Sequence, residues 1–466
     1  MTGGTLHGWT RARIRDWRHR VGLDGAVAYT VLARVSSIVG SVGTVLLIVR
    51  YLNPIEQGYY YTLLSLLNLQ IVFELGFSFV IQQFAAHESA HLRFYPDGRV
   101  EGDPVAHARL ASVLRKTVRW YIGACALMAA LLIPGGILFF ARHAHAADHV
   151  AWGLPWVVTA LACVLLFFLN PLNCFLDGCG EIRAVAKMRF AQAGLGIAAS
   201  WGALFAHRGL YAPGCVILAY VVVGIIFLST RSRLLLSLLF YRSGNHAVLW
   251  RQEVWSFQWK LGLSSLCSYF AVQVFTPAIF AMRGPLDAGK FGMSINIAGY
   301  LSTVVLAWTS TKATPFGQMI ARGEFNRLDQ AFLRTLRQSL AILGAMVLFC
   351  LAAVIAVQYL DPKLAARMVR PSLFAFLLLA ALSTLAVQSQ AIYLRAHKRE
   401  PFLVQSIAVA ALTVAGIYLL VPRFGIVGGV ATYFFSTGVV GLILATVIFQ
   451  RWRAQRHTVC DVAAVR

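Results

Sequence analysis

The sequence predicts an all-α integral membrane protein with about twelve transmembrane helices, because of its composition and its long apolar runs. Hydrophobic residues make up 59% of the 466 positions and charged residues 13%, whereas soluble globular chains carry about 25% charged residues. Uncharged runs of about 20 residues, the length that spans a bilayer as a helix, recur along the chain. The alternating pattern of outer-membrane barrels is absent from the sequence, which leaves helices as the spanning structure.

Charged residues, proline and glycine bound the individual apolar runs. The first run follows a basic segment, residues 1–24, and is too long for the core of a signal peptide, so we expect it to be retained as the first helix. We expect spans near 25–50, 58–83, 114–141, 151–176, 184–206, 210–230, 256–282, 291–312, 338–359, 371–394, 402–421 and 425–449.

The net charge of +23 follows from the loops that carry Lys and Arg. With the amino terminus inside, interior segments hold about thirty of these residues and exterior loops roughly eight, so the positive-inside rule places both termini in the cytoplasm. We therefore interpret the charge as membrane topology and expect no nucleic-acid partner. The exterior residues are Arg142, Arg208, Arg283, Lys290, Lys363, Arg367, Arg370 and Arg423.

An internal repeat divides the chain into two halves. The segment from Tyr51 to Tyr60 is echoed from Met282 onward, 231 positions later (282 − 51), with Pro, an acid and Gly in step. A second echo pairs Phe175 with Tyr393 at the end of a span. Two lobes of six helices each enter the bilayer in the same direction, so we expect an axis along the membrane normal to relate them. We expect lobes at 25–230 and 255–450, an interfacial amphipathic linker at 231–254, and a cytoplasmic tail at 451–466.

Two charged residues inside spans are the first candidates for function, because an ion in hydrocarbon is costly and is usually retained for a reason. Arg34 shares a helical face with Ser37 and Ser41 in the first span, and Glu74 shares one with Gln70 in the second. One interpretation is a buried ion pair that holds these two spans together. The other is a charged cavity, in which Arg34 attracts an anionic head group and Glu74 changes its protonation or partner.

The second half of the chain contributes a weaker polar face. Ser265 stands at the position equivalent to Arg34, and Ser268 lies on the same face one turn later. Pro171 and Pro277 each remove a backbone hydrogen bond within a span, and so mark either static kinks or hinges.

Other kinds of chemistry find little support in the sequence. Cys174 and Cys179 form the one close cysteine pair, but no second cluster lies nearby, and we expect no metal site. The phosphate-binding pattern Gly-x-x-x-x-Gly-Lys-Ser/Thr is missing, and segments outside the membrane are no longer than about thirty residues. We therefore expect that the protein is not an enzyme and binds no cofactor.

Three short motifs carry a resemblance to a known family. They are Tyr51-Leu52-Asn53-Pro54 with Gly58-Tyr59, Glu74-Leu75-Gly76-Phe77, and Phe175-Leu176-Asp177-Gly178 before a basic loop. Together with the two-lobe architecture over about 25–450, they resemble the polysaccharide-transporter (Wzx-type) branch of the multidrug/oligosaccharidyl-lipid/polysaccharide (MOP) exporter superfamily.

The resemblance implies a MATE-like fold and a flippase in the bacterial inner membrane. Its substrate would be an undecaprenyl-diphosphate-linked oligosaccharide, the repeat unit of an O-antigen, capsule or exopolysaccharide, moved by alternating access coupled to an H⁺ or Na⁺ gradient. Polymerase and chain-length components of the glycan pathway would be partners, beside membrane lipids. Arg34 best suits diphosphate contact, because a guanidinium binds phosphate in a bidentate manner.

Two alternatives remain open at this stage. A MATE-like multidrug or cation antiporter would use Glu74 as its proton site and would have a smaller, aromatic-lined cavity. A membrane-embedded glycan polymerase or ligase would need a long exterior loop with basic catalytic residues, whereas the longest exterior loop expected here, 360–370, has about ten residues.

Overall fold

The structure is a computed structural model that describes residues 25–464 apart from 96, 145–147, 242–254, 313–314, 317–318, 321 and 397–401. Within these ranges, the side chains at 25–31, 33–35, 37–39, 79, 255–258, 260–261, 396 and 454–464 are not described. The predicted basic segment 1–24 and residues 242–254 of the predicted linker therefore lie outside the description.

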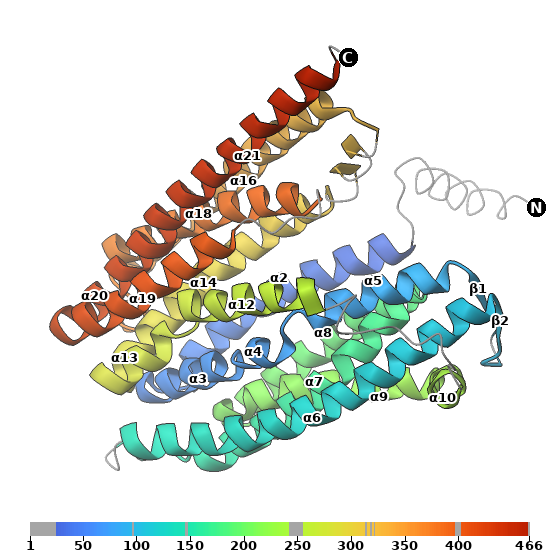
Figure 1. Cartoon of the computed structure of the whole chain (residues 1–466). Coiled ribbons are helices and arrows are strands. Elements are labelled where there is room, and N and C mark those ends of the chain that lie inside the picture. The colour runs from blue at the N-terminus through green and yellow to red at the C-terminus, as the bar shows by residue number, and fades with distance from the viewer. Residues whose placement is uncertain are drawn as a thin grey trace, which may run out of the picture.

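The first six predicted spans form one lobe, drawn from blue to green in Figure 1. Its second span consists of three consecutive short helices, and a β-hairpin follows that span. The elements are α2 (Gly25–Tyr51), α3 (Pro54–Leu67), α4 (Gln70–Glu74), α5 (Phe77–Ser89), β1 (Leu92–Phe94), β2 (Val100–Gly102), α6 (Pro104–His143), α7 (Gly153–Gly178), α8 (Ile182–Phe205), a 3₁₀ turn at Gly209–Tyr211, and α9 (Ala212–Thr230).

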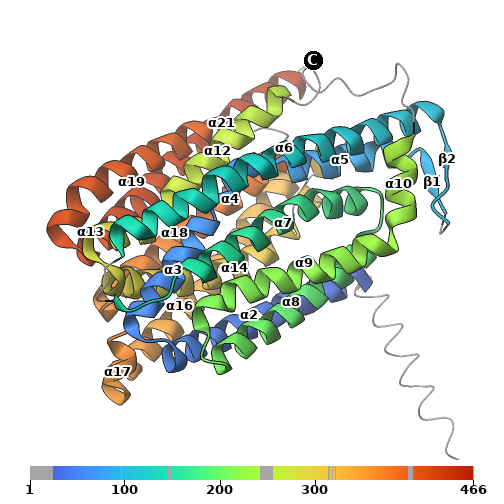
Figure 2. The same cartoon turned by 90° about the horizontal axis from the view of Figure 1, so that it is seen from below.

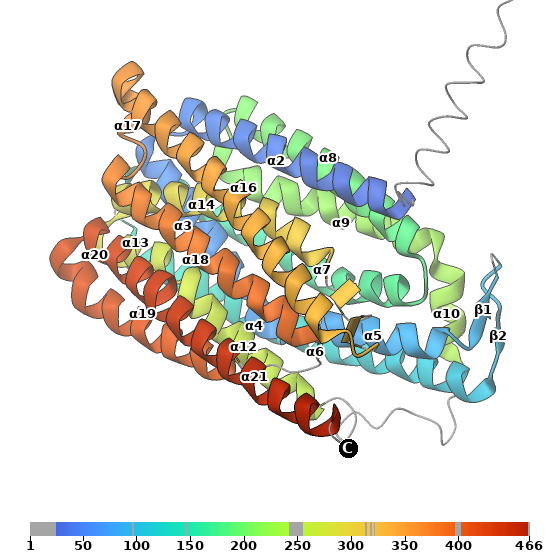
Figure 3. The same ribbon diagram turned by 90° about the horizontal axis from the view of Figure 1, so that it is seen from above.

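The last six predicted spans form the second lobe, drawn from yellow to red, and a short helix, α10 (Ser232–Phe240), follows α9 before it. Figure 3 shows the two lobes side by side from above. The elements are α12 (Trp255–Val272), α13 (Phe275–Arg283), α14 (Pro285–Ser310), α16 (Phe325–Leu360), α17 (Pro362–Ala365), α18 (Pro371–Ala396), α19 (Leu403–Phe424), α20 (Ile426–Tyr433), a π-helical stretch at Phe434–Val440, and α21 (Gly441–Ala464).

The all-α membrane architecture predicted from the sequence is confirmed. In the described part of the chain, eight helices are long and apolar enough to cross a membrane, and the bent pair α12–α13 makes a ninth. The other three predicted spans, 25–50, 58–83 and 184–206, are also helical. The span at 58–83 differs from the prediction because it is not one helix.

Two spans are interrupted, one in each lobe. In the first lobe, Leu75 and Gly76 have φ values of 48° and 71° and end α4 directly after Glu74. In the second lobe, α12 and α13 meet at an angle of 40°. Pro277 explains the second break, because proline has no backbone N–H to donate to the carbonyl four positions earlier, that of Gln273. The helix is interrupted at Gln273, between the end of α12 and the start of α13. Pro171, by contrast, lies inside the uninterrupted α7.

The repeated motif is a pair of helix starts. Asn53 caps α3 by accepting from the backbone N–H of Glu56 (2.7 Å), while the Glu56 carboxylate accepts from the Asn53 N–H (2.9 Å). Pro54 takes the first helical position. In the second lobe Pro285 begins α14 and Asp287 lies in its first turn. Proline and an acid suit a helix amino terminus, which explains why both recur.

The two copies of the motif meet where the lobes touch. A Cβ atom added to Gly58 would collide with the backbone carbonyl of Pro285, and one added to Gly289 would lie 2.9 Å from the Gly58 nitrogen and 3.3 Å from the carbonyl oxygen of Pro54. Gly289 is the repeat counterpart of Gly58, and Pro285 that of Pro54. The helices α3 and α14 therefore cross at backbone contact, with each glycine against the proline turn of the other lobe.

This crossing predicts that Gly58→Ala destabilises the protein. The added methyl meets a backbone carbonyl, which cannot move aside as a flexible side chain could, and overpacking of this kind costs about 1–3 kcal/mol. We expect a lower Tm in detergent. Gly299→Ala in α14 is the matched control, because a Cβ there meets nothing within 4 Å. Equal Tm values for the two variants would contradict the crossing.

Candidate functional site

The centre of the lobe interface is α3, which is buried on every side over most of its length. Its Gln57 side chain contacts two segments of the second lobe. Nε2 lies 3.0 Å from the Gly289 carbonyl oxygen and 3.4 Å from the Met293 Sδ, both in α14, and 3.1 Å from the Arg367 carbonyl oxygen, which follows α17. Arg367 in turn donates to Gln57 Oε1 (3.5 Å) and to the Val49 carbonyl oxygen (3.3 Å). These contacts join the lobes at the end opposite the start of α2 and the end of α21 (Figure 1).

Aromatic side chains close the same end. The ring of Tyr59 lies 4.9 Å from that of Phe280 in α13 and 5.7 Å from that of Phe140 in α6. The Tyr59 hydroxyl donates to Asp148 Oδ2 at 2.8 Å. Phe140 and Phe280 are also in contact, at 5.7 Å between ring centroids. Helices of both lobes therefore share one aromatic cluster beside Gln57.

A tyrosine group lies deeper in the interface. Tyr61 packs against Gly292 of α14, where an added Cβ would lie 2.6 Å from the Tyr61 Cβ. Its ring is 5.2 Å from that of Tyr60, and Tyr300 of α14 is close enough to both for electrostatic interaction. Tyr269 of α12 donates to the Ser65 carbonyl oxygen at 3.4 Å. The buried Tyr61 hydroxyl has no hydrogen-bond partner in the protein, so an unused polar group lies between the lobes.

Glu74 ends α4 at the break in the second span, where the chain turns through two left-handed residues. It lies within electrostatic range of Tyr121 in α6 and Cys174 in α7. The next residue, Leu75, faces the second lobe, since an added Cβ on Gly262 of α12 would lie 2.7 Å from the Leu75 Cδ2. The carboxylate thus belongs to the interior of the first lobe, one residue from the contact with the second.

Buried polar groups gather on the helices around Glu74. The hydroxyls of Ser78, Thr117 and Tyr121 and the amide oxygen of Asn173 are buried and lack a hydrogen bond of good geometry in the protein. Leaving such a group unpaired costs about 1–3 kcal/mol. Oxygen atoms beside a carboxylate are the chemistry that holds a proton or a small hard cation. Among the described residues, no three His, Cys, Asp or Glu side chains gather as metal ligands would.

Each lobe is also fixed internally at its other end. In the first lobe, Asp177 accepts from Gln82 Nε2 (3.1 Å) and lies 3.7 Å from an Arg189 nitrogen. In the second, Asp329 accepts from the Tyr393 hydroxyl (2.7 Å) and from Arg453 Nε (2.8 Å). These carboxylates join helices within a lobe and not between lobes.

Comparison with known proteins places this arrangement in a known fold. No protein-family model and no curated protein matches the chain. Solved structures do match it over nearly its whole length. One is a MATE transporter in the straight conformation (TM-score 0.55, 13% identity, 93% of this chain and 96% of that chain). The chain has the fold of the MATE transporters.

Two further solved structures show the same similarity. An inward-facing multidrug resistance MATE family transporter of the MOP superfamily matches with a TM-score of 0.55 and 14% identity, over 89% of this chain and 99% of that chain. The other is a MOP superfamily transporter from Pyrococcus furiosus, for which a binding pocket of reverse polarity suggests a different function. It matches with a TM-score of 0.54 and 14% identity, over 93% of this chain and 96% of that chain. At these identities the similarity establishes the MATE fold.

Within the MATE fold, the predicted stripe on α2 can be placed only in part. Arg34 and Ser37 belong to α2, but their side chains lie outside the description. Ser41 is half-buried. The next polar residue, Thr44, accepts from the Trp201 indole N–H at 3.1 Å, so this part of the stripe faces α8 within the first lobe. An Arg34–Glu74 pair therefore stays a prediction.

The other predicted residues are dispersed. Gln70 faces α7, where its Oε1 accepts from the Cys163 thiol at 3.1 Å. Ser265 is half-buried, whereas Ser268 is exposed and its hydroxyl donates to the Ser264 carbonyl oxygen at 2.9 Å. Gln70 and Glu74 thus share the interior of the first lobe, and the two serines lie on α12 of the second. Their roles in binding or coupling stay predictions.

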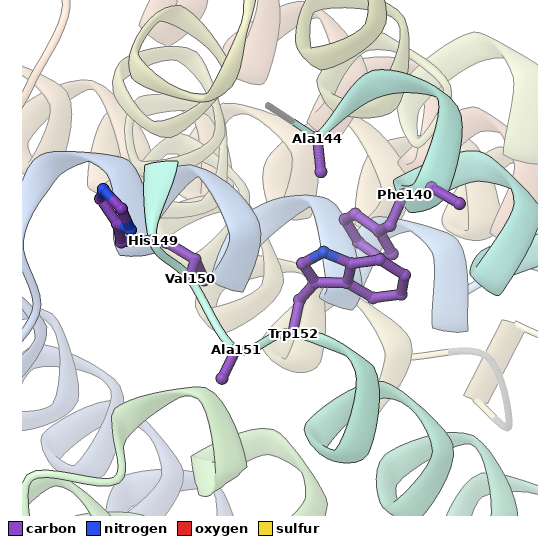
Figure 4. Close-up of a pocket in the computed structure, with 7 residues that line it drawn as sticks. Phe140, Ala144, His149, Val150, Ala151 and Trp152 are labelled. Atoms are coloured by element: carbon purple, nitrogen blue, oxygen red, sulfur yellow. The ribbon is translucent and has the colours of Figure 1, made fainter. Parts of the chain in front are cut away.

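Two hollows lie at the closed end, and neither contains a predicted site residue. One, of about 470 Å³, lies between the end of α6 and the start of α7. Figure 4 shows the rings of Phe140 and Trp152 beside each other in it, with His149 turned away from them. The other, of about 170 Å³, is lined by Lys290, Met368 and Arg370 among others.

The sequence did not indicate the residues that join the lobes. Gln57, Gly58 and Gly289 all belong to the repeated motif, so the repeat was the signal that could have found them. Their mutual contact was not deducible, because a repeat shows equivalence and not proximity. Tyr61 and Tyr121 carried no signal, since tyrosine is also common in apolar packing.

The Gln57 contacts predict that Gln57→Leu loosens the closed end. The substitution removes the side-chain donor that the Gly289 and Arg367 carbonyls share, at a cost of about 1–3 kcal/mol for buried groups left unpaired. Labelling of a Met293→Cys variant by a membrane-impermeant maleimide should then become faster. Gln83→Leu, at an exposed position in α5, should leave the labelling rate unchanged. An unchanged rate with Gln57→Leu would show that Gln57 does not hold the lobes together.

Proposed function

We propose that the protein is a transporter that works by alternating access, with the crossing of α3 and α14 as its closed gate. The observation that carries this proposal is the arrangement of contacts between the lobes. The main contacts join α3 with α13 and α14, α4 with α12, and α2 with α14. Toward the far ends of α5, α16 and α21 the lobes diverge (Figure 1). Lobes that are fixed internally and touch at one end suit alternating access, in which one lobe rocks against the other.

The substrate we propose is an undecaprenyl-diphosphate-linked oligosaccharide, flipped across the bacterial inner membrane. A glycan cannot cross hydrocarbon unaided, so it needs a polar path between the lobes, while its polyprenyl tail can remain in lipid. The repeated motifs and Arg34, a guanidinium suited to diphosphate, support this assignment. With both termini cytoplasmic, as the distribution of Lys and Arg favours, the closed gate faces the exterior and the structure is the inward-facing state.

We propose that Glu74 couples transport to an H⁺ or Na⁺ gradient. It lies near buried hydroxyl groups within the first lobe and is followed directly by Leu75, which contacts Gly262 of the second lobe. A change in the charge of Glu74 therefore acts next to the contact between the lobes. No other cofactor is required by this mechanism.

A MATE-like multidrug or cation antiporter is the second candidate, and one observation favours it. The interface group of Tyr60, Tyr61, Tyr269 and Tyr300 is aromatic, and aromatic faces bind organic cations. The same hydroxylated rings also suit sugars, so the tyrosines alone do not separate the two substrates. Transport of a fluorescent lipid-linked oligosaccharide and efflux of a cationic dye, measured in the same proteoliposomes, separate them. Dye efflux without oligosaccharide transport would replace the flippase by the antiporter.

Substitution of the two charged residues tests the mechanism. Arg34→Ala and Glu74→Gln should each reduce surface glycan assembly tenfold or more. Each substitution removes one or two charge-assisted hydrogen bonds, which contribute about 1.5–3 kcal/mol each. Protein abundance in the membrane should stay unchanged. Arg208→Ala and Glu101→Gln, at exposed loop and hairpin positions, are the controls. Normal glycan display in both test variants would remove Arg34 and Glu74 from the mechanism.

A cross-link across the gate tests alternating access. In Gln57→Cys/Met293→Cys, a short bifunctional thiol reagent should join the lobes and stop transport, because the native side chains are 3.4 Å apart. Cleavage of the cross-link should restore transport. The control pair, Thr413→Cys/Ser436→Cys, lies within the second lobe, where the two native hydroxyl oxygens are 2.9 Å apart, and should leave transport intact. Undiminished transport in the cross-linked gate variant would exclude the gate.

A further inference from the structure

The short helix α10 differs from the other helices because it cannot span a membrane. Its nine residues cover about 14 Å at 1.5 Å per residue. Figures 1 and 2 show it lying across the end of the first lobe, next to the hairpin β1–β2, while the spanning helices run lengthwise. Its orientation is therefore that of an element in the plane of the membrane surface.

Contacts with three other segments fix α10 in this position. The Ser237 hydroxyl donates to the Gly98 carbonyl oxygen of the hairpin at 2.9 Å. The Tyr241 carbonyl accepts from Arg115 of α6 at 2.7 Å, and the Tyr241 ring stacks on His107 at 3.8 Å between ring centroids. Arg231, at the amino-terminal end of α10, donates to Glu181 at 2.9 Å. The helix is thus held against the first turns of α6.

The length of α6 places α10 at the level of the lipid head groups. At 40 residues it is about 60 Å long, twice the hydrocarbon thickness of about 30 Å. Apart from Arg142 and His143 in its last turn, its charged residues lie in its first half, from Arg109 to Arg119. An uncharged run begins at Trp120, which is 40% exposed. Exposed tryptophan marks the boundary between lipid and water, and α10 docks just outside it.

One face of α10 remains uncovered and is both apolar and basic. Leu234 and Leu238 are buried against the protein, whereas Leu236 is 51% and Phe240 77% exposed. Arg233 lies on the same exposed face, three residues before Leu236, and Arg119 of α6 is exposed as well. Apolar side chains alone would suit any lipid. Exposed guanidinium groups beside them match the phosphate of a lipid with net negative charge.

We propose that α10 and the first turns of α6 form a binding surface for anionic phospholipid. Leu236 and Phe240 enter the boundary between head groups and acyl chains, and Arg233 and Arg119 bind the anionic head groups. The surface fixes the first lobe to one leaflet, so that the second lobe moves relative to an anchored partner. This inference does not depend on the identity of the transported substrate.

Lipid binding by the purified full-length protein tests the proposal. Native mass spectrometry in detergent with added phosphatidylglycerol or phosphatidylcholine should show a preference for phosphatidylglycerol. In Arg119→Ala/Arg233→Ala that preference should fall by about fivefold for each arginine removed. Arg370→Ala/Arg423→Ala is the matched control, because both side chains are exposed at the opposite end of the bundle. A preference that survives in the test variant overturns the proposal.

A second measurement uses the unmodified protein, so its outcome does not depend on whether a variant folds correctly. Photoactivatable phosphatidylglycerol, reconstituted with the unmodified protein, should cross-link to peptides from α10 and from the start of α6. Photoactivatable phosphatidylcholine should label them several-fold less. Equal labelling by the two lipids would mean that apolar contact alone covers α10, and labelling only elsewhere would mean that no lipid covers it. Either result overturns the proposal, whereas loss of transport activity bears only on the proposed function.

Discussion

The backbone contact between α3 and α14 is the constraint on which the rest of the structure depends. Lipid tails are as apolar as leucine side chains, so helices in a membrane gain little from burying apolar surface against each other. Small residues allow a close approach instead, and here Gly58 and Gly289 bring two helix starts together at Pro285 and Pro54. Only at this separation can Gln57 reach the backbone carbonyl of Gly289. The lobes are therefore joined by van der Waals contact and a few buried hydrogen bonds.

The same constraint decides how the lobes can move. Their closest contacts lie at one end, while Asp177 and Asp329 join helices within each lobe away from that end. The breaks in the second and seventh spans lie in helices that contact each other, since Leu75 faces Gly262. A structure of this kind has a rigid part in each lobe and interrupted helices between them. The arrangement links the position of Glu74, directly before one break, to the separation of the lobes.

Local features of the structure were largely predictable from the sequence. All twelve predicted ranges lie in helical segments, two of them interrupted, and the repeated motif marks two helix starts. Hydropathy, proline and capping residues predict such features because they act within a few residues. The break after Glu74 was not predicted. Leu75 and Gly76 lie inside an apolar run, and hydropathy does not reveal a left-handed backbone. The bend at Pro277 was foreseen because proline removes a specific hydrogen bond.

The sequence by itself determined that the chain is a helical membrane protein, where its helices lie, and that its two halves are related. The tertiary structure decided which faces meet: that Gln57 joins the lobes, that Gln70 faces α7, and that Thr44 faces α8. It also placed Glu74 near Tyr121 and Cys174 of the first lobe. The physical reason is the solvent. In water an amphipathic pattern shows which face of a helix is buried, but in lipid the faces toward protein and toward solvent are both apolar. Contacts between helices then follow from shape and from a few polar groups, which only the folded chain brings together.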